Sequence, residues 1–255
     1  MRLVCLCNNW LGWQVLQWLR EQGEEIAGLV VHPEEKSRYG EEIRSTVDGT
    51  NCLILDGSRL DESQVLEQVR SLRAEMAVSV MFVYLLRAEF RELFPRGCVN
   101  LHPALLPYNR GTYPNVWSIV EGTPAGASIH YIDEGVDTGD IIAQSEVVVE
   151  VTDTGASLYR RLQLASLTLF QQNWSSLRQG TAPRRPQDGT KATRHWFRDV
   201  KKIDEIDLQK SYRAKELIDV LRARTFPPYP GAYFWHNGKK IFLRLELIEE
   251  PEQKN

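Results

Sequence analysis

The sequence predicts an α/β fold in which helices cover both faces of a twisted, parallel or mixed sheet, with a small C-terminal helix and β-hairpin appended. Short segments that are apolar throughout alternate with amphipathic segments over residues 1–180. This alternation is typical of buried parallel strands and the helices that connect them. The chain has 255 residues, of which 42% are apolar and 25% are charged, which suits one large domain with a small appendage.

The first half of the chain predicts five strands, each of them short and apolar. They are expected at 1–7, 25–32, 52–55, 76–82 and 98–101. Helices are expected over 10–22 and from Asp61, and the charged segment 33–50 is interpreted as a loop with a short helix. His32 falls at the end of the second strand, where we expect it to lie on the surface.

The second half predicts a long amphipathic helix over 153–178, which Asp153 or Thr154 is able to cap. Before it we expect a helix over 115–121, a strand over 125–132 and an extended run over 141–151. After it we expect a helix over 214–224 and a hairpin over 232–247. A Pro/Arg-rich stretch separates the two parts, so the expected divisions are a catalytic domain at 1–180, a linker at 181–192 and a C-terminal region at 193–255.

Charge and cysteine usage narrow the class of protein. The net charge of −3 and the pI near 6.0 argue mildly against a broad nucleic-acid surface. No segment approaches the roughly 20 apolar residues that span a bilayer, and the N-terminus opens directly into a strand without a signal-peptide pattern. The four cysteines are expected to be buried free thiols, which fits a reducing cytoplasm; they are Cys5, Cys7, Cys52 and Cys98.

Three polar side chains between Cys98 and Asp140 suit acyl transfer. Asn100 and His102 lie two residues apart, so on a strand their side chains point to the same side. Asp137 follows in a tight turn flanked by glycines. An amide that binds an oxyanion, an imidazole that moves protons and an acid that orients the imidazole perform such chemistry without a metal or a covalent intermediate.

This stretch resembles the core of the formyltransferases that use 10-formyltetrahydrofolate. The resemblance rests on Asn-Leu-His-Pro at 100–103, Leu-Leu-Pro-Tyr-Asn-Arg-Gly at 105–111 and Gly-Val-Asp-Thr-Gly-Asp at 135–140. The family's catalytic Asn, His and Asp then fall on Asn100, His102 and Asp137. The resemblance implies a formyltransferase-type sheet, 10-formyltetrahydrofolate as the donor and no metal.

The resemblance also implies binding residues for the two substrates. The folate pocket is expected to involve Met81, Phe82, Tyr84, Leu85, Leu86, Ile132, Asp133 and Asp137. The acceptor is expected to contact Asn8, Asn9, Trp10, Tyr108, Arg110, Gly111 and Thr112. Arg110 either holds a phosphate or carboxylate of a substrate or pairs with a nearby acid of the protein. His130 is expected to be a packed, hydrogen-bonded structural residue.

The C-terminal sequence discriminates among members of this superfamily. Residues 221–234 resemble the tails of sugar-nucleotide N-formyltransferases, and 193–255 is too short for the tRNA-binding barrel of methionyl-tRNA formyltransferase. The resemblance implies a nucleotide-linked amino deoxysugar as acceptor, a homodimer, and no nucleic-acid or membrane partner. Methionyl-tRNA formylation, hydrolysis of formyltetrahydrofolate and a folate-binding module without activity remain as alternatives.

Overall fold

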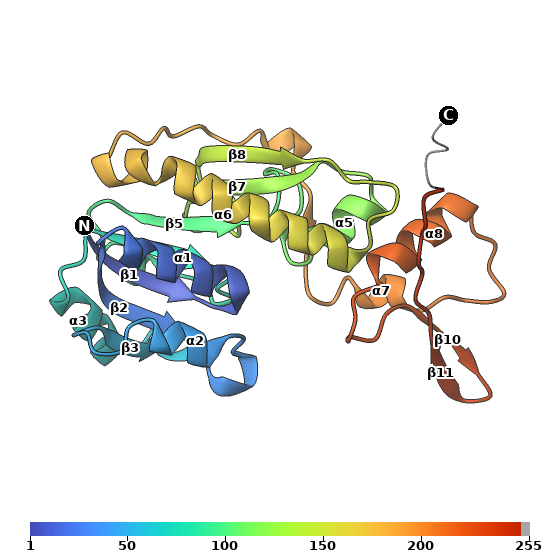
Figure 1. The fold of residues 1–255 in the computed structure, drawn as a ribbon, viewed down its shortest axis with the longest axis horizontal. Helices are drawn as coiled ribbons and strands as arrows, with labels where there is room; N and C mark the ends of the chain where they lie inside the picture. Colours follow the sequence, from blue (N-terminus) through green and yellow to red (C-terminus); the bar gives the residue numbers. More distant parts are fainter. Residues whose placement is uncertain (251–255) are drawn as a thin grey trace.

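A seven-stranded sheet forms the centre of the molecule in the computed structural model, which describes residues 1–250 (Figure 1). The strand order is β3-β2-β1-β4-β5-β7-β8. The first five strands of the chain run parallel, and β7 is antiparallel to both of its neighbours. The strands are β1 (Arg2–Cys7), β2 (Glu25–Val31), β3 (Leu53–Asp56), β4 (Met76–Val80), β5 (Cys98–His102), β7 (Ala125–Tyr131) and β8 (Ile141–Val147).

Helices cover both faces of the sheet, as predicted, and the side chains of β1 show how. Leu3, Cys5 and Cys7 point into one apolar cluster with α1, α2 and α6, whereas Val4 and Leu6 point into a second cluster with α3 and α4. The helices are α1 (Asn9–Glu21), α2 (Gly40–Ser45), α3 (Ser63–Ser71), α4 (Ala88–Arg91), α5 (Pro114–Val120), α6 (Gly155–Gln179), α7 (Lys201–Asp204) and α8 (Ala214–Ala223), with single 3₁₀ turns at Glu34–Lys36, Gly57–Arg59 and Gly189–Lys191.

The predicted boundaries shift where local backbone geometry intervenes. The strand predicted over 76–82 ends at Val80, because Met81 has a positive φ of 57° that extended backbone does not accommodate. The long helix begins at Gly155, and its cap is Thr154. There the Thr154 hydroxyl accepts a hydrogen bond from the Ser157 N–H at 3.2 Å, and the Thr154 N–H donates to the Ser157 hydroxyl at 2.9 Å.

The C-terminal region docks on the catalytic part through α8. Ala223 lies in an apolar cluster with Val116 of α5 and Leu158 of α6. Arg222 is buried, and its Nη1 donates to three main-chain carbonyls of the segment that precedes α6, at 3.0–3.2 Å. These contacts fix α8 against the loop that leads into the longest helix.

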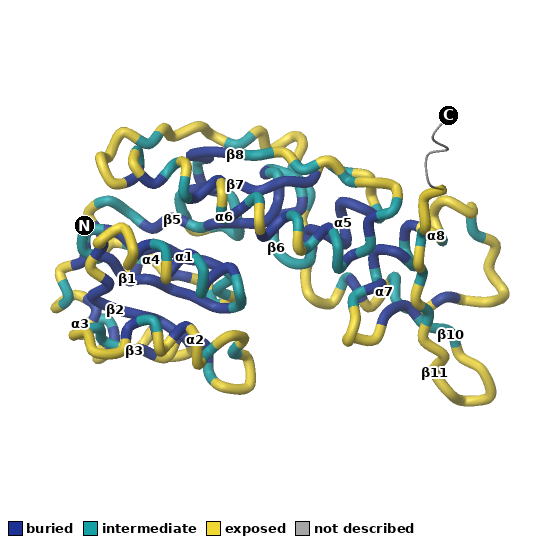
Figure 2. Tube along the Cα trace, viewed as in Figure 1, coloured by how far each residue is buried: buried dark blue, intermediate teal, exposed yellow. Residues whose placement is uncertain are grey.

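The predicted hairpin is confirmed and projects away from the body of the molecule (Figure 1). It consists of β10 (Tyr233–His236) and β11 (Lys239–Phe242), paired in antiparallel register. All four residues of β11 are exposed (Figure 2). Within residues 1–250, no helix is both long enough and apolar enough to cross a membrane.

Candidate active site

The sheet brings the polar residues of β5 and β7 face to face. Asn100 and His130 are directly opposite each other in the antiparallel ladder, so their side chains lie on the same face. Asn100 Nδ2 lies 3.1 Å from His130 Nε2, and His130 Nδ1 lies 2.8 Å from the carbonyl oxygen of Tyr131. That carbonyl fixes the ring proton on Nδ1, so Nε2 accepts from the Asn100 amide.

A tight turn presents Asp137 to this pair. The backbone of Asp137 has a positive φ of 55°. Asp133 closes the base of the turn, because its Oδ1 accepts hydrogen bonds from the Gly135 N–H at 3.0 Å and the Thr138 hydroxyl at 2.6 Å. A Cβ at Gly139 would overlap the carbonyl oxygen of Tyr131. Glycine at 139 therefore lets the turn lie directly against the end of β7.

The three residues predicted to be catalytic lie together around the Asp137 carboxylate. Its Oδ1 is 3.5 Å from Asn100 Nδ2 and 3.5 Å from His130 Nε2. Its Oδ2 is 3.6 Å from His102 Nε2 and accepts a hydrogen bond from the Gly111 N–H at 2.8 Å. The structure therefore places Asn100, His102 and Asp137 in one cluster. His130 belongs to the same cluster, which the sequence did not predict.

Burial and charge set the ionisation of the cluster. Burial lowers the pKa of His102 from its ordinary value of 6.5, and the facing Asp137 carboxylate only partly offsets this. Burial alone would raise the pKa of Asp137, but His102, His130 and the Gly111 N–H together hold it well below its usual 3.8. A neutral imidazole thus faces an ionised carboxylate at neutral pH, which is the arrangement that a general base requires.

The loop between β5 and α5 carries Asn109, Arg110 and Gly111. Asn109 is fully buried, and its carbonyl oxygen lies 3.3 Å from His102 Nε2. Arg110 and Gly111 form a short strand, β6 (Arg110–Gly111), which pairs in parallel with β9 (Arg194–His195). This pairing joins the loop to a segment more than 80 residues further along the chain.

Arg110 pairs with an amide and not with an acid. Its Nε and Nη2 donate to Oε1 of Gln187 at 3.2 and 2.8 Å. Among the described residues, no carboxylate forms an ion pair with it. Burial, followed by the nearby Arg194, lowers the pKa of Arg110. Pairing with a nearby acid, one of the two alternatives for Arg110, is therefore absent among the described residues.

The residues expected to hold folate lie in two adjacent segments beside the Asp137 cluster. Phe82, Leu86 and Ile132 pack in one apolar cluster, which joins the loop after β4 to the start of the Asp137 turn. Val83 and Leu85 of that loop remain 57% and 55% exposed. Tyr84 contacts the ring of Phe82, and Met81 directly follows the last residue of β4. Exposed apolar side chains therefore lie in the loop that packs against the start of the Asp137 turn.

The residues expected to bind the acceptor occupy different environments. Asn8 is buried and already used: its Oδ1 accepts from the Arg38 N–H at 2.8 Å, and its Nδ2 lies 2.7 Å from His32 Nδ1. Asn9 Nδ2 donates to the Tyr159 hydroxyl at 2.7 Å. Three further residues are half-buried: Trp10 in α1, and Tyr108 and Thr112 on either side of β6. The Thr112 N–H donates to the carbonyl oxygen of His195 at 3.0 Å.

His32 is buried, so the prediction that it lies on the surface is wrong. It is 2% exposed. Its Nδ1 faces Asn8, and its Nε2 lies 3.2 Å from the main-chain N–H of Val83. His32 therefore links the end of β1 to the loop after β4, and burial lowers its pKa.

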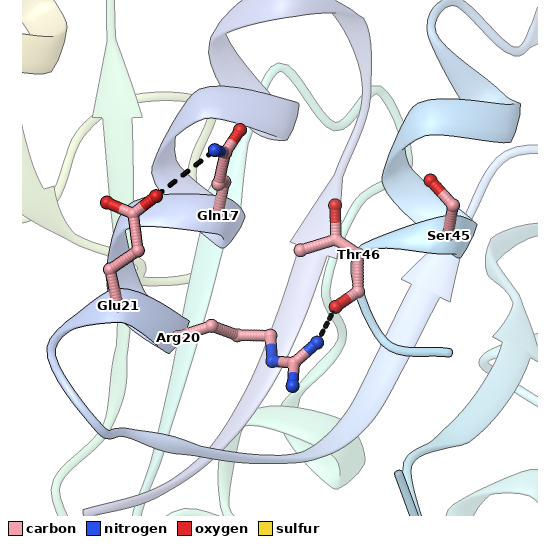
Figure 3. Close-up of a pocket in the computed structure, with 5 residues that line it drawn as sticks. All are labelled: Gln17, Arg20, Glu21, Ser45 and Thr46. Atoms are coloured by element: carbon pink, nitrogen blue, oxygen red, sulfur yellow. Dashed lines mark hydrogen bonds between the residues drawn. The ribbon is translucent and has the colours of Figure 1, made fainter. Parts of the chain in front are cut away.

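A surface hollow elsewhere contains none of these side chains. It lies between α1 and the end of α2, and Figure 3 shows Arg20 donating to the Thr46 carbonyl and Gln17 Nε2 donating to Glu21 Oε1 at 3.1 Å. These groups satisfy one another. The described residues also contain no group of three or more His, Cys, Asp or Glu side chains arranged to hold a metal ion. The chemistry of the Asp137 cluster therefore identifies the candidate active site.

The fold and the Asp137 cluster together define an acyl-group transferase of the α/β class. The chain belongs to the formyl transferase family, which depends on formyltetrahydrofolate: residues 36–172 match Formyl transferase, and residues 199–250 match the N-formyltransferase dimerization C-terminal domain. It is therefore a formyltransferase with a C-terminal dimerization domain, and the prediction of the family is confirmed.

Three proteins similar to this chain have names that point to different acceptors. A methionyl-tRNA formyltransferase of Halothermothrix orenii is 32% identical over 245 residues, which cover 91% of this chain and 76% of that protein. A dTDP-4-amino-4,6-dideoxyglucose formyltransferase of Mycobacterium bovis is 34% identical over 157 residues, covering 61% and 66%. The crystal structure of a 4-N formyltransferase from Francisella tularensis is 28% identical, with a TM-score of 0.81 and 98% coverage of both chains.

Proposed function

We propose that this enzyme transfers the formyl group of 10-formyltetrahydrofolate to the free amine of a nucleotide-linked amino deoxysugar. The observation that carries the proposal is the C-terminal region. There a helix and a hairpin follow the catalytic part, and residues 199–250 match the N-formyltransferase dimerization C-terminal domain. The Francisella 4-N formyltransferase is matched over 98% of both chains, which supports the same kind of acceptor.

Side chains near the carboxyl ends of the parallel strands, where His102 also lies, support a nucleotide-linked acceptor. Asn9 follows β1 at this end of the sheet and bonds to Tyr159 of α6. The Tyr159 ring packs on Phe226, and the Phe226 ring packs on Tyr229 of the C-terminal region, at centroid distances of 5.4 and 5.7 Å. Aromatic faces beside amide donors are suited to a nucleobase and a sugar.

In the proposed reaction the acceptor amine attacks the formyl carbon, and the bond from that carbon to the folate nitrogen breaks. Asn100 has two amide N–H groups. His130 engages the amide nitrogen from one side at 3.1 Å, and the contact of the same nitrogen with Asp137 Oδ1 is long, at 3.5 Å. The N–H on that side exchanges this long contact for the oxyanion that develops. Removing such a donor typically costs about 10²–10³ in turnover.

His102 and Asp137 move the protons. Neutral His102 takes the proton that the attacking amine loses, directly or through a water molecule. The Asp137 carboxylate, 3.6 Å from His102 Nε2, stabilises the imidazolium that forms. It also helps to return a proton to the leaving folate nitrogen. Holding donor and acceptor together supplies much of the remaining acceleration.

We also propose that the hairpin forms a homodimer. Trp235 and Phe242 are 49% and 50% exposed and lie on one face of the hairpin, and Ile241, 39% exposed, lies on the other face. An isolated hairpin is marginally stable in water, and clustered exposed apolar side chains mark interaction surfaces. The match of residues 199–250 to a dimerization domain supports the same partner, a second copy of the chain.

The experiment that tests the acceptor compares a dTDP-linked amino sugar with methionyl-tRNA at two salt concentrations. The proposal predicts formylation of the sugar at a rate that changes little with salt. A tRNA acceptor predicts binding that weakens steeply as salt rises, because phosphate contacts release counterions. Formylation of methionyl-tRNA alone, with that salt dependence, would overturn the proposal and favour the alternative.

A further inference from the structure

The strap, as we name residues 181–195, runs back over the catalytic loops after the end of α6. Near its start, Arg185 and Ile141 of β8 exchange main-chain hydrogen bonds at 2.8 and 3.1 Å. Near its end, β9 pairs with β6, and the Thr193 hydroxyl accepts from the Asn109 N–H at 2.7 Å. The strap is therefore fixed on both sides of its middle, where Gln187 lies.

Gln187 contacts the turn that carries Asp137. Its Nε2 donates to the carbonyl oxygen of Asp137 at 2.9 Å and to that of Gly139 at 2.8 Å. These two carbonyls flank Thr138, so one amide nitrogen holds both limbs of the turn. The backbone of Asp137 is in the left-handed region, which aspartate tolerates better than most residues but which hydrogen bonds from the surroundings help to hold.

The other end of the same amide contacts the loop that binds the Asp137 side chain. Gln187 Oε1 accepts from Arg110 Nε and Nη2, and the next residue, Gly111, donates its N–H to Asp137 Oδ2 at 2.8 Å. The contacts form a closed ring from the Asp137 carboxylate through Gly111, Arg110 and Gln187 back to the Asp137 carbonyl. A ring of this kind fixes main chain and side chain of Asp137 together.

Only an amide of this length completes the ring. Two acceptors on the turn require a donor, and the Arg110 guanidinium requires an acceptor. A glutamate would keep the contact with Arg110 but place oxygen against two carbonyl oxygens. A leucine of similar size would satisfy neither side.

We propose that Gln187 is a positioning residue of the reaction, which holds Asp137 at its working distance from His102. The inference rests on the role proposed above for Asp137. Gln187 itself contacts no reacting atom in this account. Displacement of a catalytic group by about 1 Å is able to cost about 10²-fold in rate, so its loss should act on turnover.

The test is a double-mutant cycle of Gln187→Leu and Asp137→Asn, assayed with 10-formyltetrahydrofolate and the dTDP-linked 4-amino-4,6-dideoxyglucose. In the parent, Gln187→Leu should lower kcat about 10- to 100-fold and leave both KM values within about twofold. In the Asp137→Asn background the same change should have almost no further effect, because residues that act as one unit are not additive. Gln187→Glu serves as the second variant, with the same expectation, should the leucine variant not fold.

Lys191→Ala is the matched control, because Lys191 is exposed on the same strap and, within residues 1–250, its side chain forms an ion pair with Asp188 alone. It should retain the parent kcat. Equal losses from Gln187→Leu in both backgrounds would overturn the inference, since they would indicate a general structural role. Parent-like kcat in Gln187→Leu, with Asp137→Asn inactive, would also overturn it and leave the proposed function standing. Full activity of Asp137→Asn would instead remove the proposed site.

Discussion

The main-chain N–H of Gly111 donates a 2.8 Å hydrogen bond to the carboxylate of Asp137, across 26 residues of sequence. This bond joins the two loops that the sequence marks most strongly, one rich in proline and the other in glycine. It also orients the carboxylate, because the oxygen that accepts this bond, Oδ2, is the one that faces His102.

Gly111→Ala should reduce turnover at least tenfold, because the loop has to move to accept a side chain. Gly111 has φ +94°, and a Cβ there would overlap the carbonyl oxygen of His195. Gly122→Ala is the matched control: its φ is +65° and its Cβ would meet nothing within 4 Å. The control should cost only about 1–2 kcal/mol of backbone strain and keep the parent kcat. Thermal unfolding and steady-state kinetics of both variants measure the difference, and equal kcat values would contradict the prediction.

The activity should depend on pH through His102. The structure holds the pKa of His102 below 6.5, so the base is neutral at neutral pH and is lost as the pH falls through that lowered value. The acidic limb of kcat/KM should therefore have its midpoint below 6.5. The groups facing His102 are Asp137, His130 and the Asn109 carbonyl. Asp137→Asn removes the charge that raises the pKa of His102 and should move the limb of the residual activity lower still; a midpoint at or above 6.5 in the parent would contradict this.

Substitution of His130 should lower turnover, although His130 is not proposed to contact a reacting group. It accepts from the Asn100 amide and so keeps the Asn100 nitrogen toward the carboxylate side. His130→Phe removes the acceptor and should lower kcat by about tenfold, part of the cost of a lost oxyanion donor. His130→Gln supplies an amide oxygen in a similar place and should recover part of the rate. Kinetics of the two variants test this, and a His130→Gln variant no better than His130→Phe would refute it.

The hairpin should carry the dimer interface. Trp235→Ser combined with Ile241→Asp should convert the dimer to a monomer, because both side chains are exposed on the hairpin. Val151→Asp is the control, since Val151 is 83% exposed on the segment before α6 and not on the hairpin. Sedimentation velocity of the three proteins measures the result. A monomeric parent, or a dimer that survives the double substitution, would argue against this interface.

Much of the fold follows from local patterns that need no structure. The apolar strands, the Thr154 cap and the Asn237-Gly238 turn are each specified within a few residues. The pairing of β6 with β9 could not be predicted in this way. Each strand has two residues, too few to show a period, and the partners lie far apart in the chain. For the same reason the sequence predicted only a linker over 181–192, without the contacts that this segment makes with β8 and the β6 loop.

In the candidate site, too, local sequence predicted some neighbours, and contacts between distant segments brought in the others. Asn100 and His102 share one strand and one face, so their spacing alone predicted the pair. His130 joined them only through the antiparallel register of β7, and Gln187 only through a turn 50 residues away. A buried polar residue on a strand next to β5 was the signal available for His130. No sequence signal distinguished Gln187 from an exposed residue of a polar segment.

The most direct test of the account is formyl transfer from 10-formyltetrahydrofolate to a panel of dTDP-, GDP- and UDP-linked amino sugars, read by mass spectrometry for the parent and for Asn100→Ala, His102→Ala and Asp137→Ala. We expect the parent to form a product heavier than one panel member by a single CO unit, and each variant to form it at least about 10²-fold more slowly. Variants that stay within a few-fold of the parent would contradict the assignment of the site. No product on any sugar, with formylation of methionyl-tRNA instead, would contradict the proposed acceptor.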